Sequence, residues 1–132
     1  MPRAMWPLRH GRPHVPIVLP ASSPNNPRTR GVLADTGAGS SQSVFELVLT
    51  EADCLLSGGI SMMQAQLGGA FTGWFPVYTL RVQIPLLGFD DDAEVVGVPA
   101  FPSGVDGIAG FRFLNRFTYG NFGDRRQFGL EM

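Results

Sequence analysis

Hydrophobic and polar residues alternate along part of the chain in the pattern typical of a β-strand. The clearest alternation places Tyr78, Leu80, Val82 and Ile84 between polar neighbours. Side chains two positions apart point to the same face of a strand, so one face of this segment is expected to be buried. The pattern predicts a half-buried strand within residues 70–84.

Shorter apolar runs, separated by glycine and proline, predict a mainly β fold. The further strands are expected at residues 15–19, 31–35, 60–67, 94–98 and 127–131. The chain has 17 glycines and 11 prolines, which weaken helices and favour turns. Gly68-Gly69 suits a two-residue hairpin turn because glycine accepts a positive φ. Residues 60–67 and 70–84 are therefore expected to form a hairpin.

The remaining segments are expected to be turns, short helices and a loose end. Thr50, followed three residues later by an acidic side chain, suits the start of a helix that continues through Leu56. A second short helix is expected within 111–117, and an exposed turn at 89–92. Residues 1–13 contain three prolines and no period. They are expected to form a flexible N-terminal arm, which leaves 14–132 as the folded domain.

Composition narrows the class of protein. The 132 residues are 44% hydrophobic and 16% charged, which predicts one packed domain. All ten cationic residues are arginines, the net charge is −1, and no basic block stands out, which weighs against nucleic acid as a partner. The apolar runs are shorter than the ~18 residues of a membrane span, so no membrane association is expected. Cys54 is the single cysteine, which suits a reducing compartment and predicts a cytoplasmic location.

One short motif carries candidate chemistry: the residues Asp35-Thr36-Gly37-Ala38 directly after an apolar strand. A carboxylate at the end of such a strand is unfavourable to bury unless it has a partner or a catalytic task. The structural alternative is an aspartate that caps a turn. The tripeptide Asp-Thr-Gly is a weak signal when it occurs alone.

Two further features follow this motif along the chain. Gln66-Leu67-Gly68-Gly69-Ala70-Phe71 lies at the tip of the expected hairpin, and Ile108-Ala109-Gly110 precedes the second expected helix. From about His14 onward, the three features in this order resemble the retropepsin-like family of aspartic peptidases. The resemblance implies a small closed barrel of the acid-protease kind, with a flap hairpin and one short helix near the C-terminus. Ala109 is smaller than the usual aliphatic residue, and Gly39 replaces a polar residue that many relatives carry.

The resemblance also implies an activity, aspartic endopeptidase, with a polypeptide substrate and no cofactor. Asp35 would be the catalytic residue, and Thr36, Gly37 and Ala38 would support it. Gly68, Gly69, Ala70 and Phe71 would form the flap over the substrate, and Ile108, Ala109 and Gly110 the second signature. Such a site needs two carboxylates that hold one water molecule. The chain has one copy of the motif and no internal repeat, so the second aspartate is expected from an identical chain in a homodimer.

Other interpretations of the same residues are less favoured. A catalytically inactive dimer of the same fold, which binds peptides or holds an assembly together, is the main alternative. His10 and His14 are separated by Pro13 and have no third ligand nearby, which weighs against a metal site. The acidic run Asp90-Asp91-Asp92 lacks the glycine-spaced loop of a calcium site and suits a solvated turn.

Overall fold

The computed structural model describes residues 2–20, 27–69, 71–102 and 104–132. Strands dominate it, as the sequence predicts. In chain order the elements are β1 (Arg3–Pro7), β2 (His14–Leu19), β3 (Arg28–Ala34), β4 (Leu47–Thr50), α1 (Glu51–Leu56), β5 (Ser61–Leu67), β6 (Gly73–Ile84), the 3-10 turn η1 (Pro85–Leu87), β7 (Phe89–Val98), β8 (Gly107–Ala109), α2 (Phe111–Leu114), β9 (Thr118–Gly120) and β10 (Gln127–Glu131).

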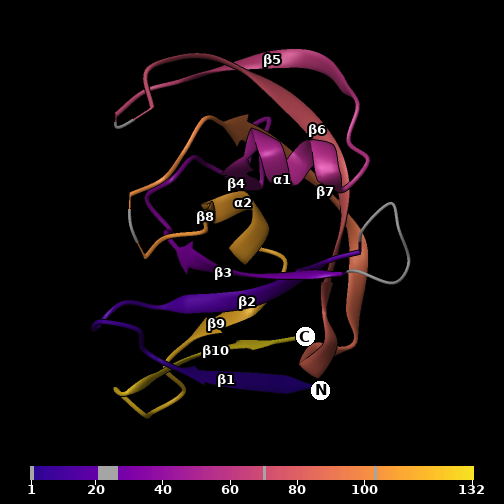
Figure 1. Ribbon diagram of the computed structural model, residues 1–132. Coiled ribbons are helices and arrows are strands. Elements are labelled where there is room, and N and C mark those ends of the chain that lie inside the picture. The colour runs from indigo at the N-terminus through magenta and orange to yellow at the C-terminus, as the bar shows by residue number, and fades with distance from the viewer. Residues whose placement is uncertain (1, 21–26, 70, 103) are drawn as a thin grey trace.

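Six strands close into a small barrel in the order β2-β3-β8-β4-β7-β6. The ring closes where β6 meets β2 through the pair Val18 and Gln83. Strand β5 pairs with β6 outside the ring, and Figure 1 shows the β5–β6 hairpin arching over the top of the molecule. The predicted fold class, a small closed barrel with a projecting hairpin, is confirmed.

The core follows from the alternation along β6. Tyr78, Leu80, Val82 and Ile84 are all buried, whereas the intervening Arg81 is exposed. Burying one apolar face of a strand is the main favourable contribution to a sheet of this kind.

Aromatic side chains from β7 and from the region of α2 fill one end of the core. Phe89, Phe113 and Phe117 contact one another edge to face, with ring centres 5.2–5.9 Å apart. This cluster fixes the helix against β7.

Both predicted helices form, although the second is shorter than expected. The Thr50 hydroxyl accepts a hydrogen bond from the Asp53 amide at 3.2 Å, so Thr50 caps α1 as its sequence context predicts. Helix α2 ends at Leu114 rather than near residue 117, because the chain turns at Asn115 and brings Phe117 onto Phe89.

The prediction of a flexible N-terminal arm is wrong for Arg3–Pro7. These residues form β1, which pairs antiparallel with β10 along its whole length, and β9 pairs with the other edge of β10. Ala4 is buried, and the Arg3 side chain forms an ion pair with Glu131 at 2.8 Å. Figure 1 shows the two ends of the chain side by side in this lower sheet. A strand with its partner 120 or more residues away in sequence has no local signal that distinguishes it from a loop.

The predicted exposed turn at 89–92 is also wrong. The chain reverses earlier, at η1 and Gly88, which has a φ of 67° that favours glycine. Asp90, Asp91 and Asp92 lie on β7 opposite 81–83 of β6. Their side chains are tolerated in a strand because this stretch faces solvent, where Arg81 forms two hydrogen bonds with Asp90.

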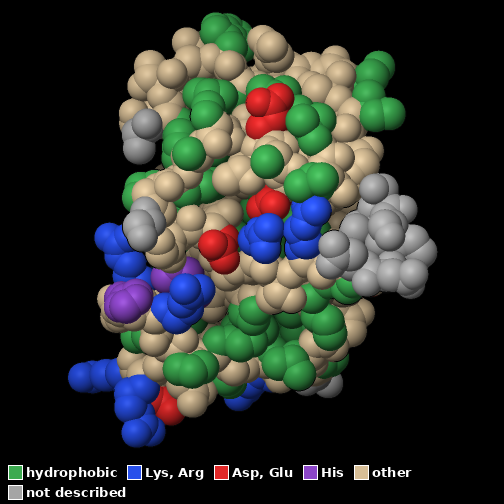
Figure 2. Space-filling model, in the orientation of Figure 1, with side chains coloured by type: hydrophobic (Ala, Val, Ile, Leu, Met, Phe, Trp, Pro, Cys, Tyr) green, Lys and Arg blue, Asp and Glu red, His purple; other side chains and the backbone are tan. Residues whose placement is uncertain are grey.

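On the face shown in Figure 2, the upper and lower parts of the molecule differ in the side chains that they present. In the space-filling view, basic side chains lie in the middle and lower parts, whereas the β5–β6 hairpin at the top presents mainly hydrophobic and uncharged groups (Figure 2). Met62, Met63 and Trp74 are among the exposed large hydrophobic side chains of this hairpin. Among the described residues, no helix is long and apolar enough to cross a bilayer.

Gly107 provides a test of the barrel packing. A Cβ atom at this position would lie 2.7 Å from the Val48 carbonyl oxygen and 2.6 Å from a Leu49 methyl carbon. Gly107→Ala is therefore expected to lower the free energy of unfolding by about 1–3 kcal/mol through overpacking.

Gly68→Ala is the matched control, since a Cβ there meets no atom within 4 Å. It is expected to change the free energy of unfolding by less than about 0.5 kcal/mol. Urea denaturation of both variants measures the difference. Equal stability of the two variants would contradict the close packing at β8.

Candidate active site

Asp35 follows directly after β3, at the point where β3 runs parallel to β8. Leu33 pairs with Ile108, and Ala34 pairs with Ala109. The Asp35 amide continues the pairing by donating to the Ala109 carbonyl at 2.9 Å. The two sequence signatures, some 70 residues apart, therefore meet at one edge of the barrel.

The loop after Asp35 holds its carboxylate in a fixed orientation. The Gly37 amide donates to Oδ1 of Asp35 at 2.9 Å, and the Ala38 amide donates to the Asp35 carbonyl at 3.1 Å. A Cβ on Gly37 would lie 3.3 Å from the same carboxylate oxygen. Glycine at this position thus lets the backbone approach the carboxylate closely. The Asp35 side chain is half-buried, so the aspartate is both oriented and accessible.

Residues at the start of α2 anchor this loop from behind. The Phe111 amide donates to the Ala38 carbonyl and the Gly110 amide to the Glu46 carbonyl, both at 2.9 Å. A Cβ on Gly110 would lie 2.8 Å from the Ala38 carbonyl oxygen. The glycine of the second signature is therefore required by the close approach of α2 to the loop.

The loop and the β5–β6 hairpin face each other across a cleft of about 490 Å³. The loop side is lined by Asp35, Gly37, Ala38, Gly39, Phe45, Val48 and Ile108. The hairpin side is lined by Gln66, Leu67, Gly68, Gly69 and Phe71. An extended polypeptide could lie in this space with its backbone close to the carboxylate.

The structure brings most of the predicted site residues together at this cleft, with some differences. Ile108 lies in the wall, whereas Ala109 and Gly110 are buried behind it and act through their backbone atoms. Thr36 is exposed on the loop. Ala70 lies outside the described residues.

The hairpin connection differs from the predicted two-residue turn. Strand β5 ends at Leu67 and β6 begins at Gly73, so the connection spans 68–72. Gly69 has a φ of 71°, and its carbonyl accepts a hydrogen bond from the Thr72 hydroxyl at 3.1 Å. The tip is thus wider than a tight hairpin turn.

Sequence reasoning missed several apolar residues of the cleft. Phe45 and Val48 line it directly, and Phe101 contacts the Phe71 ring edge to face with centres 5.2 Å apart. The hydrophobic pattern marks such residues as apolar. It does not distinguish a cleft wall from a core, because both bury carbon.

Three aromatic residues of β6 have separate roles. Tyr78 is in the core and donates its hydroxyl to Glu51 at 3.2 Å, Phe75 packs on a second apolar cluster, and Trp74 is exposed. None of the three is among the residues that line the Asp35 cleft.

Alternative chemistry has little support in the part of the chain that the structure describes. Within those ranges, no group of three or more His, Cys, Asp or Glu side chains is arranged to hold a metal ion. Cys54 is fully buried on α1. Burial, together with the nearby carboxylates of Asp53 and Glu51, raises the pKa of its thiol to about 12.

Comparisons with known proteins identify the fold. No family model and no curated protein matches the sequence. Among solved structures, a retropepsin-like aspartic protease from Rickettsia conorii matches with a TM-score of 0.62 and 17% identity, over 97% of this chain and 89% of that one. The foamy viral protease-reverse transcriptase, solved with an RNA/DNA hybrid, matches with a TM-score of 0.56 and 18% identity, over 82% of this chain and 12% of that one. The chain therefore has the fold of retropepsin-like aspartic proteases, as its motifs predict.

The burial of Cys54 yields a prediction about its reactivity. A thiol of pKa about 12 is ionised in roughly one molecule in ten thousand at pH 8, and the thiolate is the reactive form. Native protein is expected to react very slowly with Ellman's reagent at pH 8. Protein unfolded in guanidinium chloride should react quickly and release one equivalent of the reagent's coloured thiolate per chain. Rapid reaction of the native protein would contradict the buried position of Cys54 and reopen the question of a cysteine nucleophile.

Proposed function

We propose that the chain is one subunit of a homodimeric aspartic endopeptidase. The observation that carries this proposal is the position of Asp35. Its oriented, half-buried carboxylate lies in a cleft beneath a glycine-tipped hairpin, in the fold of retropepsin-like aspartic proteases. The fold alone does not decide activity. The site supports it because the carboxylate is accessible at the point where a peptide would lie.

The proposed reaction uses a water molecule held between two aspartates. The ionised carboxylate takes a proton from the water, while the protonated one donates a hydrogen bond to the substrate carbonyl. The water oxygen attacks the carbonyl carbon, and the C–N bond then breaks as a proton passes to the leaving nitrogen. Two carboxylates so close together share one proton and titrate as a pair. The Gly37 amide would keep Asp35 aimed at the water throughout.

The requirement for a second aspartate supports the homodimer. The sequence holds a single Asp-Thr-Gly motif, and two equivalent groups are obtained by a two-fold axis between identical chains. Thr36 is exposed beside Asp35, which leaves its hydroxyl free to bond to the loop of a partner.

The cleft supports a polypeptide substrate with apolar residues around the cleaved bond. Phe45, Val48, Leu67, Phe71 and Ile108 contribute apolar wall on both sides of it. An extended peptide can add to such a site as a strand held by main-chain hydrogen bonds. The proposed chemistry needs no cofactor, and the single, buried cysteine supports the proposal of a cytoplasmic location.

Asp35→Asn tests the proposed function. The variant keeps the size of the side chain and removes the general base. Its kcat/KM on a casein or peptide-library substrate is therefore expected to fall by about 100- to 10,000-fold at unchanged thermal stability. Asp92→Asn is the matched control, because it removes an exposed carboxylate on β7 and should retain full activity.

Equal activity of Asp35→Asn and wild type would contradict the catalytic assignment. Inactivity of both proteins, together with peptide binding in the cleft, would favour the alternative of a catalytically inactive dimeric module. Tight binding of a statine-type inhibitor, which imitates the tetrahedral intermediate, would support the peptidase.

A further inference from the structure

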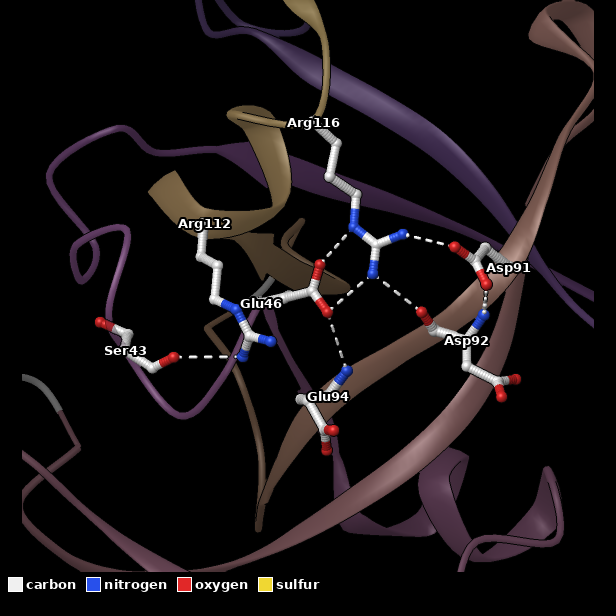
Figure 3. A network of polar contacts seen from close by, with 7 residues as sticks. All are labelled: Ser43, Glu46, Asp91, Asp92, Glu94, Arg112 and Arg116. Carbon is white, nitrogen blue, oxygen red and sulfur yellow. Dashed lines mark hydrogen bonds and ion pairs between the residues drawn. The ribbon is translucent and has the colours of Figure 1, made fainter.

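A buried carboxylate lies directly behind the active-site loop. Glu46 is only 2% exposed, and its side chain is bound by Arg116, which follows α2. Nη2 of Arg116 donates to Oε1 of Glu46 at 2.9 Å, and Nε donates to Oε2, so the pair has the two-pronged geometry of a strong ion pair (Figure 3).

The same guanidinium joins this pair to β7. Nη1 donates to the Asp91 carboxylate at 3.0 Å and Nη2 to the Asp92 carbonyl at 2.9 Å. The Glu94 amide also donates to the Glu46 carboxylate at 3.2 Å. The hydrogen bond to Glu46 raises the pKa of Arg116, and the opposing effect of burial is smaller. Each nitrogen of this guanidinium therefore donates to Glu46 or to a residue of β7.

A chain of backbone hydrogen bonds leads from Glu46 to the backbone of Asp35. The Glu46 carbonyl accepts the Gly110 amide, the Ala38 carbonyl accepts the Phe111 amide, and the Asp35 carbonyl accepts the Ala38 amide. Three segments therefore meet here: the loop, the start of α2, and the residue just before β4. They pack closely, because a Cβ added at Gly110 would lie only 2.8 Å from the Ala38 carbonyl oxygen.

A second arginine holds the middle of the loop. Nη1 of Arg112, on α2, donates to the Ser43 carbonyl at 3.1 Å (Figure 3). Within the loop, the Ser40 amide donates to the Ser43 hydroxyl at 2.7 Å. The loop from Thr36 to Glu46 is thus bound to α2 near its start and in its middle, and at its end to Gly110 and Arg116, which flank α2.

We propose that Glu46 and Arg116 are positioning residues for Asp35. This inference rests on the proposed peptidase function. Their ion pair holds α2 against the active-site loop, so that loosening it shifts the loop without exposing the core. A displacement of about 1 Å at a reacting group can lower the rate by about 100-fold. The pair therefore acts on the catalytic step more than on substrate binding.

The chain contains a matched control pair elsewhere. Arg30 donates from Nε and Nη2 to the two oxygens of Asp53 at 2.8 and 2.9 Å, and Asp53 is 6% exposed. This pair joins β3 to α1 and makes no hydrogen bond with the loop 36–46. Loss of either pair should lower the stability of the protein by a similar amount. Only loss of the Glu46–Arg116 pair should lower kcat.

The first measurement compares Glu46→Gln with Asp53→Asn in steady-state kinetics. Glu46→Gln is expected to lower kcat by about 10- to 100-fold while KM changes by less than about threefold. Asp53→Asn is expected to keep kcat within about threefold of wild type, although both variants melt at a lower temperature. Arg116→Lys keeps the positive charge but cannot bind the carboxylate through two nitrogens, so its kcat should lie between those of wild type and Glu46→Gln. If Glu46→Gln does not fold, Arg116→Lys takes its place in the comparison with Asp53→Asn.

The second measurement is amide hydrogen exchange, which needs no enzymatic activity. The Ala38, Gly110 and Phe111 amides are expected to lose protection in Glu46→Gln, or in Arg116→Lys, and to keep it in Asp53→Asn under conditions where each protein is folded. An inactive wild type would contradict the proposed function, and the exchange comparison would still decide whether the pair holds the loop. Unchanged protection of these amides, or a kcat no lower than that of Asp53→Asn, would overturn the positioning role.

Discussion

The short parallel pairing of β3 with β8 is the constraint on which the rest of the site depends. It comprises two residue pairs, Leu33 with Ile108 and Ala34 with Ala109, extended by the hydrogen bond from the Asp35 amide. This pairing places the aspartate at the end of a buried strand and brings the start of α2 beneath its loop. The closed barrel supplies the remaining rigidity, because each of the two strands has a neighbour on its other edge: β2 beside β3 and β4 beside β8. Fixed surroundings of this kind hold the carboxylate in one orientation.

The opposite wall of the cleft is formed by the β5–β6 hairpin, which is held differently from the loop. Among the strands that the structure describes, β5 pairs with β6 alone and stands outside the barrel, and most of its side chains are exposed. Segments with few buried contacts open at low cost in free energy. The contrast between a fixed loop and a lightly held hairpin supports the proposed role of the hairpin as a flap, since a cover over a substrate has to move while the reacting groups stay in place.

The sequence predicts those features that depend on neighbours in the chain. The alternation through Tyr78 to Ile84, the Thr50 cap and the placement of Asp35 after an apolar strand are local signals, and the structure has the strand, the helix and the strand end at these positions. Strand β1 was missed because its partner lies at the other end of the chain, and the acidic run of β7 because three consecutive aspartates are typical of a turn.

The contacts that complete the site cannot be predicted from neighbouring residues, because their partners are far apart in the sequence. Glu46 and Arg116 are 70 residues apart, and neither has a motif that connects them. Phe45 and Val48 have the same apolar character as core residues. The resemblance in motif order supplied what periodicity could not, namely that the aspartate, the hairpin and the second signature belong to one site.

The claim that two identical chains share one site is tested most directly by mixing subunits. Wild-type protein at constant concentration is equilibrated with increasing amounts of Asp35→Asn, and peptidase activity per wild-type chain is measured. Chain exchange is followed separately by mass spectrometry of labelled subunits. If each site needs Asp35 from both chains, activity falls towards zero as mixed dimers replace wild-type dimers. Constant activity per wild-type chain, at ratios where exchange is complete, would contradict the shared site.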